Sequence, residues 1–572
     1  MKILLATLHS RYSHASLALP SLATACSEIP RVASVIREWT IHEQPDRLLR
    51  RLVSEEADLY GFSCYIWNLE QTLRLVADLK QLRPDAVMVL GGPEASFGVF
   101  ELMARVPAVD CVVRGEGEES FRELVAAVSL HGALPPGELL EKIAGITCRI
   151  DDAVVATPDR PPVLCLDSLA SPFDAGLVDL SKPLVYVETS RGCPFSCAFC
   201  LSSLDRGVRS YASQRIRDDL SLLMDREVAT IKLVDRTFNY DPQRANDIWE
   251  FILRHNRSSL FHFEISAELL TEENFRLLRQ VPAGLFRFEI GVQSGDAAIL
   301  KRVGRNSDPE RLLTTVRRLR EESGVVIHLD LVAGLPGEGL GGFLASLEQL
   351  LGCSPHHIQV EPLKVLKGVA MRRIAAEQGY IFAEAPPYKI LRTPWLSFQE
   401  IVLIEDISRL LDLIVNSGRF TRFLGAVARE LPLSSFFQQL ARFAGAIEAL
   451  EPRSTVELCD LIHRFLAETM GETPLLLDAL SFDYCRSEQP SAARLPSCFG
   501  GNPGSREARG PGRSAPESFP VGARIRRFRR SFLLNYQEQP WQEGPVELLF
   551  TYIARQGEGE RVEVTTRPFR GR

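Results

Sequence analysis

The sequence lacks an excess of positive charge, because its 66 Lys and Arg residues are outnumbered by 73 Asp and Glu residues and the formal net charge is −7. Domains that bind nucleic acids normally carry a basic excess that neutralises phosphates. The acidic balance therefore argues against a nucleic acid as a partner of this protein.

Long apolar runs are also missing. No stretch of about eighteen apolar residues is present, which is the length that a membrane-spanning helix requires. The amino terminus is apolar for only six residues before His9 and Arg11, and the apolar core of a signal peptide is longer. We therefore expect no membrane partner and a cytoplasmic location.

A regular cysteine framework is absent as well. The twelve Cys residues are scattered, apart from three near the middle of the chain, whereas small secreted proteins space their cysteines densely. We expect reduced thiols in a reducing compartment. Cys353, Cys459, Cys485 and Cys498 lie far apart in the chain and form no C-x-x-C pair, so the sequence does not support a second cluster.

The composition is that of an ordinary globular protein, with 45% hydrophobic and 24% charged residues. A chain of 572 residues is too long for a single core. The length therefore predicts three or so domains.

The centre of the chain carries the motif C-x3-C-x2-C, formed by Cys193, Cys197 and Cys200. Three thiolates at this spacing can hold three corners of one iron–sulfur cube and leave its fourth iron open. The alternatives are a zinc knuckle or three buried core cysteines. Zinc sites usually supply four ligands, and no fourth Cys or His lies nearby at knuckle spacing. The motif therefore favours an iron–sulfur cluster.

This motif, with the aromatic Phe199 directly before its third Cys, resembles that of the radical S-adenosylmethionine enzymes. The resemblance implies a 4Fe-4S cluster whose open iron chelates S-adenosylmethionine. It also implies that one electron from the cluster splits this cofactor to a 5′-deoxyadenosyl radical. A small protein such as flavodoxin or ferredoxin would supply the electron.

Residues 1–130 alternate short apolar runs with amphipathic helical patterns. Four strands are expected, at 2–6, 58–63, 86–90 and 110–113. Continuous apolar runs that alternate with helices indicate a doubly wound parallel sheet, and ligands of such sheets bind at the carboxyl ends of the strands.

The expected strand ends are rich in glycine, which lets the backbone approach a large flat ligand. Their order resembles that of the cobalamin-binding domain which precedes the cluster domain in one subgroup of radical S-adenosylmethionine enzymes. The resemblance implies cobalamin contacts from His9, Ser63, Gly91, Gly92, Gly115 and Glu116.

The loop after the first strand departs from one familiar cobalamin motif. Many cobalamin proteins have Asp-x-His-x-x-Gly there, whose His becomes the lower ligand of cobalt. This chain keeps His9 but lacks the Asp and the Gly, and an imidazole without a carboxylate partner is less firmly oriented. Ligation by His9 and binding of cobalamin with no protein ligand both remain open.

Residues 131–180 are expected to be a connector that contains a hairpin over 143–150 and 153–157. Apolar runs then recur at 184–189, 230–234, 262–266, 286–292, 326–332 and 357–363. Six strand–helix repeats over residues 181–370 predict a partial (β/α)6 TIM-type barrel, with its chemistry at the carboxyl ends of the strands.

The expected strand ends of this barrel resemble the stations at which the family binds S-adenosylmethionine. The resemblance implies cofactor contacts from Phe199, Asp235, Glu268, Glu289, Gln293, Ser294 and Gly334. For each polar residue taken alone, a structural role inside the barrel is the competing interpretation. No catalytic residue is assigned.

The pattern changes after residue 370. Residues 371–484 are expected to form a mostly helical extension, with helices over 398–416 and from Ser454 to Leu466. Residues 485–523 are rich in Pro, Gly, Ser and Arg and are expected to be disordered. Within 524–572, an Arg cluster precedes expected strands at 532–536 and 546–553.

The resemblance covers about residues 1–370 and implies methyl transfer from methylcobalamin to an unactivated carbon of a small-molecule or natural-product substrate. A first alternative is a radical cyclase or rearrangement enzyme of the porphyrin-cyclase type. A methylthiotransferase fits less well, because Cys26, Cys64 and Cys111 do not match that group's cluster ligands. A non-catalytic cobalamin- and iron–sulfur-binding regulator is the alternative from another class.

Overall fold

The computed structural model describes residues 1–150, 153–205, 207–490, 494–500, 505–506, 524–537, 541–554 and 561–567. It divides into two compact units. The first unit comprises residues 1–328, 334–338 and 362–397, and the second comprises residues 329–333, 339–361 and 398–572.

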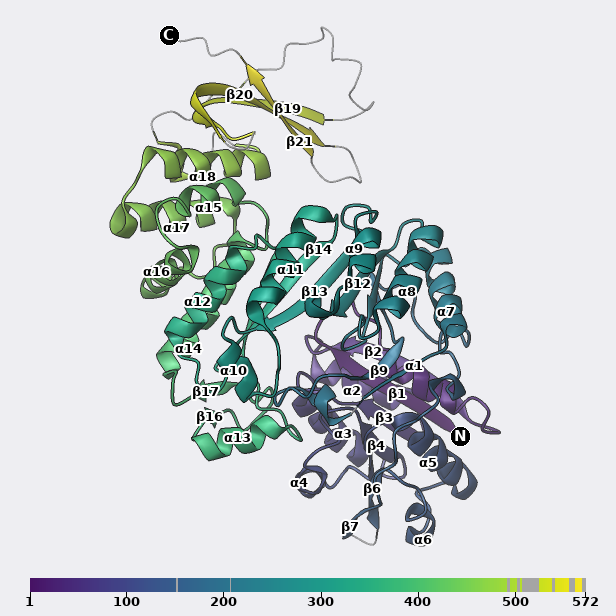
Figure 1. The fold of residues 1–572 in the computed structure, drawn as a ribbon. Coiled ribbons are helices and arrows are strands. Elements are labelled where there is room, and N and C mark those ends of the chain that lie inside the picture. Colours follow the sequence, from purple (N-terminus) through teal and green to yellow (C-terminus); the bar gives the residue numbers. More distant parts are fainter. Residues whose placement is uncertain are drawn as a thin grey trace. The chain divides into compact units, whose positions relative to one another are not determined.

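The first unit begins with a sheet of strand order β2-β1-β3-β4-β5-β6-β7, in which β1 to β5 run parallel (Figure 1). Its strands are β1 (Lys2–His9), β2 (Ala33–Thr40), β3 (Leu59–Ser63), β4 (Val87–Gly91), β5 (Cys111–Val113), β6 (Ile146–Ile150) and β7 (Ala153–Ala156). Its helices are α1 (Ala18–Ala25), α2 (Pro45–Ser54), α3 (Leu69–Leu82), α4 (Val99–Arg105), α5 (Gly117–His131) and α6 (Gly137–Leu140).

Helices cover both faces of this sheet. On one face, Leu52 of α2 and Val76 of α3 belong to one buried apolar cluster. On the other face, Leu19 of α1 and Phe121 of α5 belong to a second cluster. A parallel sheet with helices on both faces is a doubly wound sheet, so this prediction is confirmed. The burial of both faces explains why its strands are continuous apolar runs.

Two features of this sheet differ from the sequence analysis. Strand β2 was not predicted, because it is an edge strand in which no residue is fully buried and no apolar run appears. The predicted hairpin is present as β6 and β7, but it extends the first sheet, since β6 pairs antiparallel with β5.

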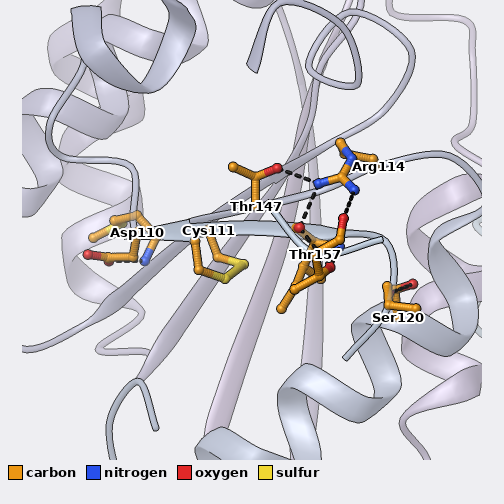
Figure 2. Close-up of a disulfide and its surroundings, with 10 residues drawn as sticks. Asp110, Cys111, Arg114, Ser120, Thr147 and Thr157 are labelled. Atoms are coloured by element: carbon orange, nitrogen blue, oxygen red, sulfur yellow. Dashed lines mark hydrogen bonds between the residues drawn. A yellow bond between two sulfur atoms is a disulfide. The ribbon is translucent and has the colours of Figure 1, made fainter. Parts of the chain in front are cut away.

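The expectation that all the thiols are reduced is wrong for one pair, because a disulfide joins Cys111 and Cys148 (Figure 2). These residues lie directly opposite each other on β5 and β6, with their Cα atoms 4.1 Å apart. Strand pairing between residues 37 positions apart creates this proximity, which no sequence spacing reveals. The other ten cysteines form no disulfide.

The second sheet holds the six strands predicted for the partial barrel, in the order β15-β14-β13-β12-β11-β8 (Figure 1). These strands are β8 (Leu184–Val187), β11 (Thr230–Leu233), β12 (Leu260–Ile265), β13 (Phe286–Gln293), β14 (Val326–Ala333) and β15 (His357–Pro362). The intervening helices are α7 (Ser213–Asp225), α8 (Pro242–His255), α9 (Glu272–Leu278), α10 (Ala297–Arg302), α11 (Pro309–Glu322) and α12 (Leu340–Leu351). The predicted strand–helix alternation is confirmed to within a few residues.

The first unit also contains smaller elements. They are η1 (Leu166–Ser168), β9 (Ser190–Cys193), η2 (Leu201–Leu204), β10 (Gly207–Ser210), η3 (Ala267–Leu269), α13 (Ala370–Gln378), β16 (Ile381–Phe382) and β17 (Ile390–Arg392). The most informative are β9 and β10, because they form a two-stranded hairpin that carries the first motif cysteine.

After residue 397 the second unit is helical and then forms a small sheet. Its helices are α14 (Phe398–Ile414), α15 (Thr421–Val427), α16 (Leu433–Ala446), α17 (Thr455–Phe465), the π-helix η4 (Leu466–Met470), α18 (Pro474–Ser487) and η5 (Ser497–Phe499). Its strands are β18 (Ser505–Arg506), β19 (Arg524–Asn535), β20 (Gln542–Ala554) and β21 (Arg561–Arg567). Within the described ranges, no helix is both long and apolar enough to cross a bilayer.

The predicted cap of α17 forms, since Ser454 accepts a hydrogen bond from the Glu457 amide at 3.3 Å. The segment predicted to be disordered begins inside α18, and most of it lies outside the described residues. The Arg cluster belongs to β19 and does not precede the strand, because β19 is longer than the predicted 532–536.

Two cysteines that are distant in the sequence meet in the second unit. Cys459 of α17 and Cys498 of η5 are both buried and their thiols share a hydrogen bond. This bond and burial raise the pKa of Cys459, while the same bond lowers the pKa of Cys498. The packing of η5 against α17 brings them together, so their sequence spacing gave no sign of the pair.

Candidate active site

The three motif cysteines lie at the end of β9 and in the loop that follows it. Cys193 is the last residue of β9, and the hairpin partner of Gly192 is Val208. Gly192 has φ of +90°, and a Cβ atom there would lie 2.1 Å from the Gly207 carbonyl oxygen. Glycine is therefore required beside Cys193, so that the two hairpin strands can approach each other.

The loop is anchored at its centre to two other parts of the first unit. The Ala198 amide donates to the Val303 carbonyl at 2.8 Å, and the Ala198 carbonyl accepts from the Met371 amide at 2.8 Å. Backbone bonds of this kind hold Cys197 and Cys200 in place without using their side chains.

The three thiols are close enough to influence one another. Burial raises the pKa of Cys197, and the Cys193 and Cys200 thiols add to this effect. The Arg305 guanidinium opposes it, with Nη1 3.9 Å from the Cys197 sulfur. Among the described residues, no three His, Cys, Asp or Glu side chains could hold a single metal ion. Iron–sulfur clusters take thiolate ligands, and the three thiols of this loop are donors of that kind.

Arg305 is a residue that the sequence analysis missed. Besides approaching Cys197, its guanidinium donates to the Gly291 carbonyl of β13. Arg305 therefore joins the cysteine loop to the strand that carries Glu289 and Gln293. No motif marks this arginine, because its role depends on the fold of the barrel.

Asp235 lies just after β11 and is fully buried. Its carboxylate accepts from the Thr189 amide at 3.1 Å, from the Thr189 hydroxyl at 2.6 Å and from the Ser190 hydroxyl. Arg244 Nη2 lies 3.7 Å away. Asp235 thus holds the chain directly before the cysteine loop, and its predicted contact with S-adenosylmethionine stays a prediction.

Gln293 ends β13 in the left-handed backbone region, with φ of +71°. Its Oε1 atom is buried and has no hydrogen-bond partner among the described residues. A buried polar atom without a partner costs about 1–3 kcal/mol, so this oxygen fits a ligand that donates a hydrogen bond, such as a ribose hydroxyl. The neighbouring Ser294 donates to Glu338 at 2.6 Å.

The other residues predicted to contact S-adenosylmethionine are Glu268, Gly334 and Phe199, and the first two form hydrogen bonds within the protein. Glu268 accepts from the Ser307 hydroxyl at 2.5 Å and from the Asp308 amide at 2.9 Å. The Gly334 carbonyl accepts from the Tyr380 hydroxyl at 3.1 Å. Phe199 is partly buried in the cysteine loop.

Glu289 points into the barrel and forms ion pairs with two neighbouring strands. Its carboxylate lies 2.9 Å from Lys232 Nζ of β11 and 2.9 Å from His262 Nε2 of β12. Although burial opposes it, the His262 and Lys232 contacts lower the pKa of Glu289 to about 2. Burial raises the pKa of Glu264, which lies opposite Glu289 on β12. The inward face of these strands is therefore charged and polar.

The strand ends of the first sheet place the predicted corrinoid contacts along one edge. Ser63 ends β3 opposite Gly91, which ends β4. Gly92 has φ of +93°, and a Cβ there would lie 2.7 Å from the Cys64 carbonyl oxygen, so the backbone itself requires this glycine. Gly115 has φ of +71° with open space where a Cβ would lie. This open side fits the close approach of a flat ligand.

His9 has a carboxylate partner that the sequence analysis did not find. Its Nε2 atom lies 3.2 Å from Glu38 Oε2, and only 12% of the His9 side chain is exposed. The absence of an Asp from the loop suggested a poorly oriented imidazole, and this is corrected by the structure. Glu38 lies on β2, the strand that was not predicted.

Glu116, a predicted corrinoid contact, is bound to protein groups. Its carboxylate lies 2.5 Å from Arg209 Nη2 and accepts from the Val163 amide at 2.9 Å. Burial opposes ionisation, but the Arg209 bond outweighs it and lowers the pKa of Glu116. Arg209 belongs to β10, so Glu116 links the first sheet to the hairpin of the cysteine loop.

The loop after β1 extends to the edge strand of the second sheet. The Leu184 amide of β8 donates to the Ser13 carbonyl at 3.2 Å, and the Ala15 amide donates to the Leu184 carbonyl at 3.3 Å. His14 Nδ1 lies 3.2 Å from the Tyr186 hydroxyl. The loop that carries His9 therefore continues along β8, the strand that precedes the cysteine hairpin.

Three family models match the chain. The B12 binding domain matches residues 3–125, the Radical SAM superfamily matches residues 187–350, and a protein of unknown function (DUF4080) matches residues 376–507. The first two ranges contain the glycine-rich strand ends and the cysteine loop, respectively.

Individual relatives are distant. An uncharacterized methyltransferase of Pyrococcus horikoshii is 28% identical over 291 residues, which are 50% of this chain and 61% of the relative. The anaerobic magnesium-protoporphyrin IX monomethyl ester cyclase of Rubrivivax gelatinosus is 25% identical over 308 residues, which are 51% of this chain and 54% of the relative. The chain thus spans somewhat more than half the length of these curated relatives.

One solved structure has the same fold over most of the chain. The cobalamin-dependent S-adenosylmethionine radical enzyme OxsB, with aqua-cobalamin and S-adenosylmethionine bound, matches with a TM-score of 0.60 at 15% identity. The match covers 84% of this chain and 78% of that chain. Because the family models fall on the glycine-rich sheet and on the sheet that carries the cysteine loop, the chain contains a B12-binding domain followed by a radical S-adenosylmethionine domain.

Proposed function

We propose that this protein is a cobalamin-dependent radical methyltransferase that acts on an unactivated carbon. The single observation that carries the proposal is that the cysteine loop and the glycine-rich strand ends belong to one compact unit. The salt bridge between Arg191 and Glu118, at 2.6 Å, joins these two stations directly. A methyl donor and a radical generator have to lie near one substrate, and this arrangement provides for both.

The residues of this chain would hold the three cofactors as follows. Cys193, Cys197 and Cys200 would bind a 4Fe-4S cluster, Gln293 would accept a hydrogen bond from S-adenosylmethionine, and Gly115 would leave room for the corrin ring. When bound, these groups supply reductive cleavage of S-adenosylmethionine to a carbon radical and a methyl group for transfer. The protein supplies orientation and excludes water.

The charged side chains on the inward face of the second sheet favour a polar substrate over an apolar one. Solvent reaches 19% of the Lys232 side chain and 25% of the Glu264 and Glu289 side chains, although all three point inward. Charged groups that remain partly hydrated favour a molecule that forms hydrogen bonds over a wholly apolar one. A small polar molecule or natural product is the proposed substrate, with flavodoxin or ferredoxin as the proposed electron donor.

A radical cyclase or rearrangement enzyme is the second candidate. The relative from Rubrivivax gelatinosus is named as a cyclase, and its similarity is close to that of the methyltransferase relative. The same cofactor stations would serve both reactions. The outcome therefore depends on whether the methyl group of the corrinoid is consumed.

The test is an anaerobic assay of the reconstituted protein with reductant, S-adenosylmethionine and cobalamin. We expect both 5′-deoxyadenosine and S-adenosylhomocysteine, because the second product accompanies each renewal of the methyl donor. 5′-Deoxyadenosine alone would favour the cyclase. If neither product forms with any polar substrate tested, the proposal fails in favour of a non-catalytic regulator.

A further inference from the structure

One arginine beside the cysteine loop contacts carboxylates of the B12-binding domain. Arg191 Nη2 lies 2.6 Å from Glu118 Oε1, and Nη1 lies 3.4 Å from Glu116 Oε2. Its Nε donates to Glu188 at 2.9 Å. The Arg191 guanidinium thus lies among three carboxylates.

The contact joins the hairpin of the cysteine loop to the start of helix α5. Arg191 lies on β9, two residues before Cys193. Glu118 lies in the first turn of α5, and Glu116 immediately precedes that helix and follows Gly115. One guanidinium therefore connects the start of the cysteine loop to the strand end with the open space for a flat ligand.

A second arginine repeats the connection from the other strand of the hairpin. Arg209 lies opposite Arg191 in the pairing of β9 with β10. Its Nη2 atom lies 2.5 Å from Glu116 and 2.7 Å from Asp205. Both strands of the hairpin are thereby tied to the same end of α5.

Stability alone does not explain this network. The Arg191 side chain is 13% exposed and the Glu118 side chain is 10% exposed. Removing such charges from water costs free energy, whereas burying apolar side chains at the same place would not. Apolar surfaces can slide against each other, whereas a planar guanidinium bound by several carboxylates permits one arrangement. The network therefore defines a position.

We propose that Arg191 is a positioning residue that sets the corrinoid station relative to the cysteine loop and so couples radical formation to methyl transfer. The claim that Arg191 couples radical formation to methyl transfer rests on the proposed function. The claim that Arg191 docks α5 on the hairpin does not, and it can be measured without turnover.

The experiment uses the full chain with Arg191→Met, Arg191→Lys and Glu118→Gln. Arg122→Met is the matched control, because Arg122 lies on the same helix α5 and its guanidinium donates to Glu119 of that helix. Hydrogen–deuterium exchange is followed in residues 117–121 and 190–200. The ratio of S-adenosylhomocysteine to 5′-deoxyadenosine is measured in the anaerobic assay.

We expect Arg191→Met and Glu118→Gln to exchange faster in both segments while the control does not. A misplacement of about 1 Å can lower a rate about 100-fold, so we expect methylation to fall by about that factor while 5′-deoxyadenosine still forms. Arg191→Lys should restore the ratio only in part, since an ammonium lacks the planar fork.

The proposal is overturned if Arg191→Met and Glu118→Gln match the control in both readouts. If Arg191→Met does not fold, Glu118→Gln decides, because it removes one charge and no volume. If the unaltered protein makes neither product, the proposed function fails, and the exchange data alone support or overturn the docking role of Arg191.

Discussion

His9 Nε2 of β1 lies 3.2 Å from Glu38 Oε2 of β2, within the edge pair of strands of the B12-binding domain. Glu38 is also fixed from a second side, because its Oε1 accepts from the Ser16 amide at 2.9 Å. The ring nitrogen that faces Glu38 is therefore occupied by a protein partner, and it would have to leave this partner to bind cobalt.

This geometry excludes ligation of cobalt by Nε2 while the Glu38 contact is kept. We predict that Nδ1, the other ring nitrogen, does not bind cobalt either and that cobalamin is held without a protein ligand. We expect His9→Gln to bind cobalamin as the unaltered protein does, with no nitrogen splitting in the electron paramagnetic resonance spectrum of the Co(II) form of either. Nitrogen splitting in the unaltered protein that disappears in His9→Gln would contradict the prediction.

The cysteine motif predicts that Cys193→Ala, Cys197→Ala and Cys200→Ala each lose the cluster, because the loop offers no substitute thiolate. Iron and sulfide content after anaerobic reconstitution measures this. Cys165→Ala is the control, since Cys165 is free and exposed. Full iron and sulfide in any motif variant would remove that residue from the ligand set.

Removal of the Asp235 charge should destabilise the first unit. Asp235→Asn weakens several hydrogen bonds to Thr189 and Ser190 and leaves Arg244 without its nearby charge, so we expect a loss of about 3 kcal/mol in the free energy of unfolding. Urea unfolding followed by the fluorescence of the buried Trp249 measures it. Glu273→Gln, at an exposed pair with Arg276, should change stability by less than about 1 kcal/mol.

Gln293→Ala should weaken the binding of S-adenosylmethionine without weakening the fold. The buried Oε1 atom has no partner to lose among the described residues, so a hydrogen bond to the cofactor is the main loss, and we expect about a tenfold lower affinity. Calorimetric titration of the reconstituted protein tests this. Gln280→Ala, at an exposed site on the surface, serves as the control. Equal affinities in the two variants would contradict the assignment.

The second unit should lose stability as the pH rises. Burial raises the pKa of Asp483 from 3.8 to about 7, despite the bonds that it accepts from the Arg422 and Phe423 amides. Between pH 3.8 and about pH 7, Asp483 therefore keeps its proton in the folded state and has lost it in the unfolded state. This contribution is complete below about pH 4 and is lost as the pH passes 7, and it amounts to about 4 kcal/mol.

Asp483→Asn should remove the Asp483 contribution, because an amide does not titrate in this range. Burial also raises the pKa of Asp478 to about 6, so a smaller dependence should remain below pH 6. Thermal unfolding at several pH values between 4 and 8 compares the variant with the unaltered protein. Glu448→Gln, at an exposed site in the same unit, should keep the original slope. A parallel pH dependence of Asp483→Asn and the unaltered protein would refute the prediction.

Most strands of the two sheets and the position of the cysteine motif could be predicted from the sequence alone. Buried parallel strands such as β4 and β12 are apolar on the faces that helices cover. Their alternation with helices can therefore be predicted from the sequence. The thiols at positions 193, 197 and 200 lie within one loop, and a local spacing carries their chemistry.

The partners of the remaining site residues became known only from the three-dimensional fold. Glu38 lies on an edge strand without an apolar run, Arg305 reaches Cys197 across 108 positions, and Arg191 reaches Glu118 across 73. Each of these contacts joins elements that are distant in the chain, and side chains on separate elements have no fixed spacing in the sequence. Their pairing follows from how the sheets pack, which is set by the burial of the whole core and not by any local pattern.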